Sequence, residues 1–159
     1  MADLRPHTIV ALVKDRPGVL GRIVTRCGER DFNISTLAVG SCEQPGLSRM
    51  TFVVDASTDA TALVYELGKF EEVVELQDIS AREFVSRELA LVKVRSTKQS
   101  RAQVLEIVGI FDANVVDVTQ DTLIVEVTGH ERKIDSMVRL LKDFDVVELV
   151  RTGRVSMVN

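Results

Sequence analysis

The order of apolar segments repeats along this chain of 159 residues. In each half, a run typical of a buried strand precedes a helical segment, two more strand-like runs, a second helical segment and a last strand. The expected strands are 7–13, 33–39, 47–54 and 73–79 in the first half, and 89–94, 115–118, 123–127 and 146–150 in the second. This repeated βαββαβ order predicts an α+β fold of two tandem ferredoxin-like domains, residues 1–80 and 81–159.

The helices are predicted from apolar side chains that recur at helical spacing. The positions that mark their buried faces are Val19, Leu20, Ile23, Val24 and Cys27; Leu63, Val64 and Leu67; Val104, Leu105, Val108 and Phe111; and Ile134, Met137, Val138 and Leu141. The first helix is expected to start near Pro17, the second to be capped by Ser57 or Thr58, and the last to hold His130 in its first turn. Residues 151–159 are expected to form a tail.

One face of the first sheet is expected to need a covering partner. Two helices cover only one face of a four-stranded sheet, yet residues 9–13 are apolar on both sides of their strand. The partner is either the other half of the chain or a second copy. A second copy is favoured, because a bare face of this kind would be a large exposed apolar patch.

Composition narrows the class of protein. The chain is 45% hydrophobic and 28% charged, so it can build a core, and with no Trp its core must be filled by Val, Ile and Leu. A net charge of −4 argues against a nucleic-acid binder. No apolar run approaches the roughly 20 residues of a membrane span, and residues 1–6 do not resemble a signal peptide. Cys27 and Cys42 fit no disulfide framework, so a cytoplasmic location is expected.

The segment Lys14–Leu20, KDRPGVL, stands where the first strand meets the first helix. Gly18 has no Cβ, so a ligand can approach the backbone there, and the helix start offers unpaired N–H groups and the positive end of the helix dipole. This suits a small carboxylate, while Asp15 and Asn33 suit an ammonium group. The segment is also compatible with an ordinary strand-to-helix turn, with Asp15 near the N-cap.

Catalytic and metal-binding sites are not predicted. His7 and His130 are the only histidines and are far apart in the sequence, and no Cys or carboxylates cluster at metal spacing. Cys27 lies on an apolar helix face, which favours a core position. Arg22, Arg26 and Arg30 follow one polar helix face, which is either solvated or docks an acidic partner surface. A small enzyme would need an acid–base pair that the sequence does not offer.

Several segments resemble one known family. Asp15–Leu20, followed by DFNISTLAVG at 31–40, is similar to the ACT domain of the small regulatory subunit of acetolactate synthase (acetohydroxyacid synthase). Further segments match that family in its own order, namely 47–51, 87–94, 116–119, 128–129 with 133–135, and 151–153. The chain departs from the family pattern at Asp15, where Asn is frequent, and at Ser35, where an acid is usual.

The resemblance implies a subunit without catalysis of its own and without a cofactor. It would bind and activate a catalytic subunit that carries thiamine diphosphate, Mg and FAD, and confer feedback inhibition by valine or a related branched-chain amino acid. The effector would lie between two ACT domains of a homodimer. The implied effector-binding residues are Asp15, Pro17, Gly18, Val19, Leu20, Asn33 and Ile34. Gly18 and its neighbours would meet the effector carboxylate, and Asn33 and Ile34 of the facing protomer would meet its amino group. Asp15 could pair with the ammonium group but would repel the carboxylate.

A second interpretation is a free-standing tandem ACT sensor that regulates transcription or another enzyme. It shares the first motif, but would not explain the matches in the second half.

Overall fold

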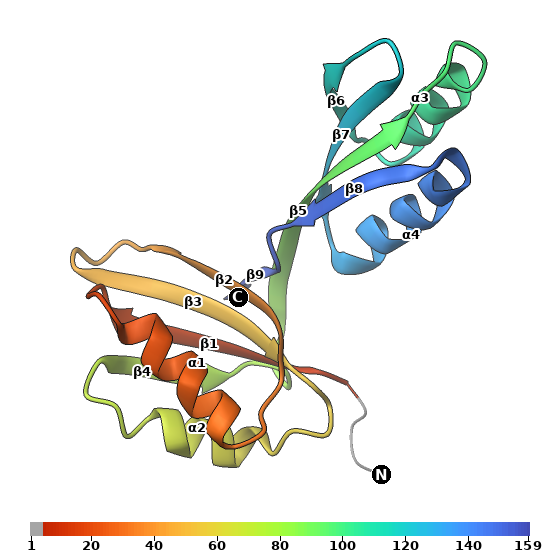
Figure 1. Cartoon of the computed structure of the whole chain (residues 1–159). Coiled ribbons are helices and arrows are strands. Elements are labelled where there is room, and N and C mark those ends of the chain that lie inside the picture. Colours follow the sequence, from red (N-terminus) through yellow and green to blue (C-terminus); the bar gives the residue numbers. More distant parts are fainter. Residues whose placement is uncertain (1–4) are drawn as a thin grey trace. The chain divides into compact units, whose positions relative to one another are not determined.

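The computed structural model describes residues 5–159 and divides them into two compact units. The first unit comprises residues 5–85 together with 153–159, and the second comprises Ser86–Thr152. Each unit contains a four-stranded antiparallel sheet and two α-helices (Figure 1). The predicted pair of ferredoxin-like domains is confirmed.

The first unit follows the predicted βαββαβ order. Its elements are β1 (His7–Lys14), α1 (Val19–Glu29), β2 (Ile34–Ser41), β3 (Leu47–Val54), α2 (Ala60–Leu67) and β4 (Val73–Asp78). The strands lie in the order β2-β3-β1-β4, so β2 and β4 are the edges. The N-cap of α2 is Asp59, whose carboxylate accepts the N–H of Ala62 at 3.0 Å, rather than the predicted Ser57 or Thr58.

The core of the first unit lies between one sheet face and the two helices (Figure 1). Its members come from alternating strand positions and from one stripe of each helix: Ile9, Ala11, Val13, Met50, Phe52 and Val54 from the sheet, and Val19, Ile23, Cys27, Ala60, Leu63 and Leu67 from the helices. Alternation along a strand sends successive side chains to opposite faces, which is why these residues share one side.

The second unit repeats the arrangement. Its elements are β5 (Phe84–Arg95), which starts in the first unit, α3 (Arg101–Ile110), β6 (Asn114–Val118), β7 (Thr122–Gly129), α4 (Glu131–Leu141), a 3₁₀ turn (Lys142–Phe144) and β8 (Val146–Arg151). The strand order is β6-β7-β5-β8. His130 is the N-cap of α4 and so stands one residue before the helix, where its Nδ1 accepts the N–H of Arg132 at 3.4 Å.

The predicted tail contains a ninth strand, which is a correction. β9 (Val155–Val158) pairs with β5, and the Arg154 guanidinium donates to Thr8 Oγ1 at 3.2 Å in the first unit. Residues 153–159 therefore belong to the first unit, which differs from the division at residue 80. A four-residue strand carries too little periodicity to be recognised alone, and its partner is distant in the sequence.

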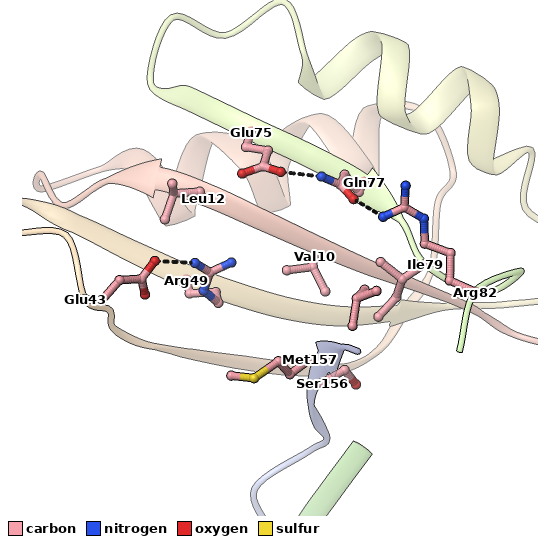
Figure 2. Close-up of a pocket in the computed structure, with 11 residues that line it drawn as sticks. Val10, Leu12, Glu43, Arg49, Glu75, Gln77, Ile79, Arg82, Ser156 and Met157 are labelled. Carbon is pink, nitrogen blue, oxygen red and sulfur yellow. Dashed lines mark hydrogen bonds and ion pairs between the residues drawn. The ribbon is translucent and has the colours of Figure 1, made fainter. Parts of the chain in front are cut away.

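β9 also supplies part of the cover for the second face of the first sheet. Ser156 and Met157 of β9 and Val10 of β1 line a groove of about 430 Å³ between β9 and the sheet (Figure 2). Charged and polar side chains at its rim bind one another: Arg49 with Glu43 at 2.9 Å, Gln77 with Glu75, and Arg82 with Gln77 at 3.0 Å. The chain itself therefore covers some of the face for which a second copy was favoured.

Two aspartates end helices in a left-handed conformation. Asp31 follows α1 with φ 56° and Asp112 follows α3 with φ 46°, the helix-ending position that glycine usually occupies. We expect Asp31→Gly to raise the free energy of unfolding by about 0.5–1 kcal/mol, because glycine adopts this conformation without steric cost. Hydrogen exchange of the core strands in the unit that carries the substitution measures the change. Asp145→Gly is the matched control, since φ is 64° there but the Asp145 carboxylate also binds Arg95 at 2.8 Å. Loss of this ion pair should make the gain at Asp145 smaller. An equal gain at both positions would contradict this account.

Candidate functional site

The site begins in the turn that joins β1 to α1. The Asp15 N–H donates to the Gly46 carbonyl at 2.9 Å, which fixes the turn against the β2–β3 hairpin. The Arg16 N–H donates to the Lys14 carbonyl at 3.0 Å. Gly18 is the N-cap with φ 88°, and the helix begins at Val19, so Pro17 precedes the helix instead of opening it.

Gly18 is needed for its conformation, since its φ lies in a region that L-residues rarely adopt. A Cβ placed there would meet no atom within 4 Å, so the space in front of the backbone is open. The next residues begin α1, where N–H groups have no intrahelical acceptor and the dipole is positive. The first turn of α1 contains no acidic side chain, which leaves this end of the helix free for an external carboxylate.

An open hollow of about 440 Å³ lies beside this turn. Its lining residues are Gly18, Gly21, Arg22, Thr25, Arg26, Glu29 and Phe70. The Arg22 guanidinium lies 5.0 Å from the centre of the Phe70 ring and forms an ion pair with Glu72. The hollow thus combines a helix N-terminus with two cations, Arg22 and Arg26, that are already partly neutralised by carboxylates.

The predicted residues of this turn differ in accessibility. Asp15, Pro17 and Gly18 are exposed, and the Leu20 side chain is 42% exposed. Val19 is only 6% exposed and packs in the core, so its side chain does not face a ligand. Of Val19, only the backbone is accessible to a ligand at this turn.

Asn33 and Ile34 lie at the opposite end of the same sheet. Ile34 pairs with Val54, which pairs with His7 at the start of β1, whereas the Gly18 turn follows Lys14 at its end. At about 3.3 Å per residue, the length of β1 separates the two ends by roughly 23 Å. One copy of the chain therefore does not bring the two halves of the predicted site together.

The side chain of Asn33 is held in a defined orientation. Its Nδ2 donates to Asp55 Oδ2 at 3.0 Å. Because Nδ2 is committed to a carboxylate, Oδ1 is the atom left to accept a hydrogen bond from a ligand ammonium group.

The equivalent turn in the second unit is closed. The Ser96 N–H donates to the Asp121 carbonyl at 2.8 Å, just as Asp15 does to Gly46, so the two turns correspond. Here the Arg101 guanidinium fills the opening and donates to the carbonyls of Ser96, Thr119 and Gln120 at 2.9–3.1 Å. The second unit thus carries its own cation where the first unit has an open turn.

The remaining candidates have structural partners. The buried position of Cys27 raises the pKa of its thiol, which disfavours a nucleophile. No group of three His, Cys, Asp or Glu side chains within residues 5–159 is arranged to hold a metal ion.

The arginines of α1 are engaged within the unit. Arg26 and Arg30 approach Glu66 at 3.7 and 3.0 Å. The hydrogen bond from Lys69, together with the nearby Arg30 charge, holds the pKa of Glu66 below its usual value. This polar face is therefore an internal ion-pair network rather than a row of free cations.

Two tandem ferredoxin-like units, the first with an open strand-to-helix turn, define the class of tandem ACT-type proteins. A sequence model described as an AHAS small subunit-like ACT domain matches residues 9–75, and one described as the small subunit of acetolactate synthase matches residues 87–159. The chain belongs to the acetolactate synthase small subunit family. The name of the family implies a catalytic subunit as the partner.

Individual relatives match over nearly the whole chain. The acetolactate synthase small subunit of Mycobacterium leprae is 43% identical over 158 residues, which is 99% of this chain and 94% of the relative. The probable small subunit of Archaeoglobus fulgidus is 39% identical and covers 96% of both. The crystal structure of the small subunit from Thermotoga maritima superposes with a TM-score of 0.88 at 34% identity and 98% coverage of both chains.

Of the helices in residues 5–159, none has the length and apolar character to cross a membrane.

Proposed function

We infer that this chain is a non-catalytic regulatory subunit that binds the acetolactate synthase catalytic subunit and raises its activity. In this proposal it also confers feedback inhibition by valine or a related branched-chain amino acid. Thiamine diphosphate, Mg and FAD belong to the catalytic partner. The observation that carries the effector role is the open turn at Gly18, in a chain of the small subunit family.

A homodimer through the first units would complete the effector site. β2 is an edge strand of the sheet, and apolar side chains are exposed on it, at Val39, and on α1, at Leu20 and Val24. An edge of this kind pairs readily with another strand. If two copies place their β2 strands antiparallel across a two-fold axis, the Asn33 end of one strand meets the Ser41 end of the other. Ser41 pairs with Ser48, and Ser48 pairs with Val13 near the end of β1. The Ser41 end of β2 therefore lies at the same end of the sheet as the Gly18 turn.

In such a dimer each group of the effector finds a partner. The α-carboxylate lies at the N-terminus of α1 beside Gly18, where backbone N–H groups and the helix dipole favour an anion. The α-ammonium group donates to Asn33 Oδ1 of the second copy and lies near the exposed Asp15 carboxylate. The apolar side chain packs against Leu20 and Ile34.

Inhibition then follows from a preference of the effector for one dimer arrangement. A ligand shifts an equilibrium only by its differential affinity for the two states. A coupling of about 1–3 kcal/mol would produce inhibition of 5- to 150-fold.

Calorimetric titration of valine into the isolated protein tests the proposal. We expect a single class of sites and no more than one valine per chain, because the equivalent turn of the second unit is filled by Arg101. Absence of binding by valine, leucine and isoleucine would refute the sensing role. Two sites per chain would refute the assignment to the first unit alone.

The matches in residues 87–159 favour this function over that of a free-standing sensor. Co-purification decides between the two. A regulatory subunit should isolate with a large thiamine-diphosphate-dependent chain, whereas a free-standing sensor should not.

A further inference from the structure

The chain leaves the first unit after Val85 and returns to it after Thr152. The returning residues, 152–154, are here called the return segment. Arg151, the residue before the return segment, binds Glu88 of the second unit at 2.7 and 2.8 Å. The first residue of the segment, Thr152, donates its N–H to the Leu89 carbonyl of the second unit at 3.0 Å. The last residue, Arg154, donates to Thr8 in β1 of the first unit. The return segment is thus held at both ends.

Gly153 lies in the middle of the return segment and is buried against β2. A Cβ at this position would lie 3.3 Å from Leu37 N and from Thr36 Cβ, and 3.4 Å from Leu37 O. Its φ is 77°, so both the conformation and the close approach require glycine. A side chain here would press against the backbone of β2, which would have to shift by a few tenths of an ångström to admit it.

The stretch of β2 beneath Gly153 is irregular. The register with β3 shifts between Ile34 and Thr36, and the bulged Ser35 donates its Oγ to the Val53 carbonyl at 3.1 Å. Thr36 Oγ1 is buried without a hydrogen-bond partner among the described residues. Bulges occur frequently beside functional sites, where they redirect a strand. Only the bulged Ser35 lies between Ile34 and the Gly153 contact, which begins at Thr36.

We propose that the contact of Gly153 with Thr36 and Leu37 transmits occupation of the effector site to the second unit. The proposal rests on the function inferred above. An effector held by Asn33 and Ile34 constrains the start of β2 and its bulge, and Gly153 bears on the next two residues. The return segment continues directly into Arg151 and β8 of the second unit. A change in the bulge therefore reaches the second unit without passing through the core.

Gly153→Ala in the holoenzyme reconstituted with the catalytic subunit tests the proposal. The added Cβ pushes the return segment away from β2. We expect valine to bind with a Kd within about threefold of wild type and activation to persist. The factor by which valine disfavours the active state, about 5- to 150-fold in typical allosteric proteins, should fall toward one, so that bound valine no longer inhibits.

Gly109→Ala, in α3, is the control for an added methyl group, because a Cβ there would meet no atom within 4 Å. This variant should keep wild-type inhibition. Gly153→Asn should behave like Gly153→Ala, because asparagine tolerates the left-handed conformation but still carries a Cβ. It replaces Gly153→Ala if that variant does not fold.

Hydrogen exchange supplies a readout independent of activity. In wild type, valine should change the protection of the Thr36 and Leu37 amides and also that of the β8 amides. In Gly153→Ala, valine should change only the protection of the Thr36 and Leu37 amides. Full inhibition of both Gly153 variants, loss of valine binding in them, or no response of β8 in wild type would overturn the proposal. If wild type itself neither binds valine nor is inhibited by it, the proposed function fails instead.

Discussion

Gly18→Asp should abolish feedback inhibition by valine while activation of the catalytic subunit persists. The new carboxylate enters the open space in front of the helix N-terminus, where the effector carboxylate is proposed to lie. Two like charges placed side by side cost several kcal/mol, so we expect the affinity for valine to fall at least about 100-fold. Calorimetry on the isolated protein and inhibition of the reconstituted holoenzyme measure the two effects.

Gly18→Asn separates charge from shape in this experiment. Asparagine and aspartate have nearly the same size and both tolerate a positive φ, so they share the strain at φ 88°. The Asn variant should retain much more valine affinity than the Asp variant. Equal losses would show that the helix N-terminus does not receive a carboxylate. Loss of activation together with inhibition would show that the turn also forms part of the docking surface.

Glu88→Leu should destabilise the second unit by about 3 kcal/mol. The Glu88 side chain is 4% exposed and accepts two hydrogen bonds from Arg151, which also binds Asp135 at 2.7 Å. The hydrogen bonds that Arg151 donates to Glu88 raise the pKa of Arg151. A guanidinium stays protonated even without them, so the Arg151 charge remains when Glu88 is removed. Breaking a buried pair costs about 3–5 kcal/mol, and the partial exposure of Arg151 places the loss at the lower end.

Hydrogen exchange of β5 and β7 measures this loss unit by unit, which a single unfolding curve of a two-unit chain does not. Asp135→Asn is the control, because Asp135 is 44% exposed and an exposed pair contributes at most about 1 kcal/mol. The double variant Glu88→Leu with Arg151→Leu should recover much of the stability, since the charge it leaves without a partner, on Asp135, is exposed to water rather than buried. A loss at Asp135 as large as that at Glu88 would contradict this assignment.

The predicted fold agrees with the structure where the signal is local and periodic. β3 spans the predicted 47–54, and each predicted helix face supplies core residues such as Ile23 and Met137. The turn at Gly18 was also accessible from sequence, because a glycine between a strand and an amphipathic helix marks a helix start. Helix starts are harder to predict, because several neighbouring residues can cap a helix. The N-cap of α2, for example, is Asp59 and not the predicted Ser57 or Thr58.

Patterns within a few neighbouring residues therefore suffice to predict the duplicated βαββαβ order, the two cores and a strand-to-helix turn at Gly18. They do not reveal that Asn33 lies far from Gly18 in one copy, that Arg101 closes the second turn, or that residues 153–159 return to the first unit. Those features depend on pairings between residues distant in the chain. Their energies come from contacts that no short stretch of sequence contains.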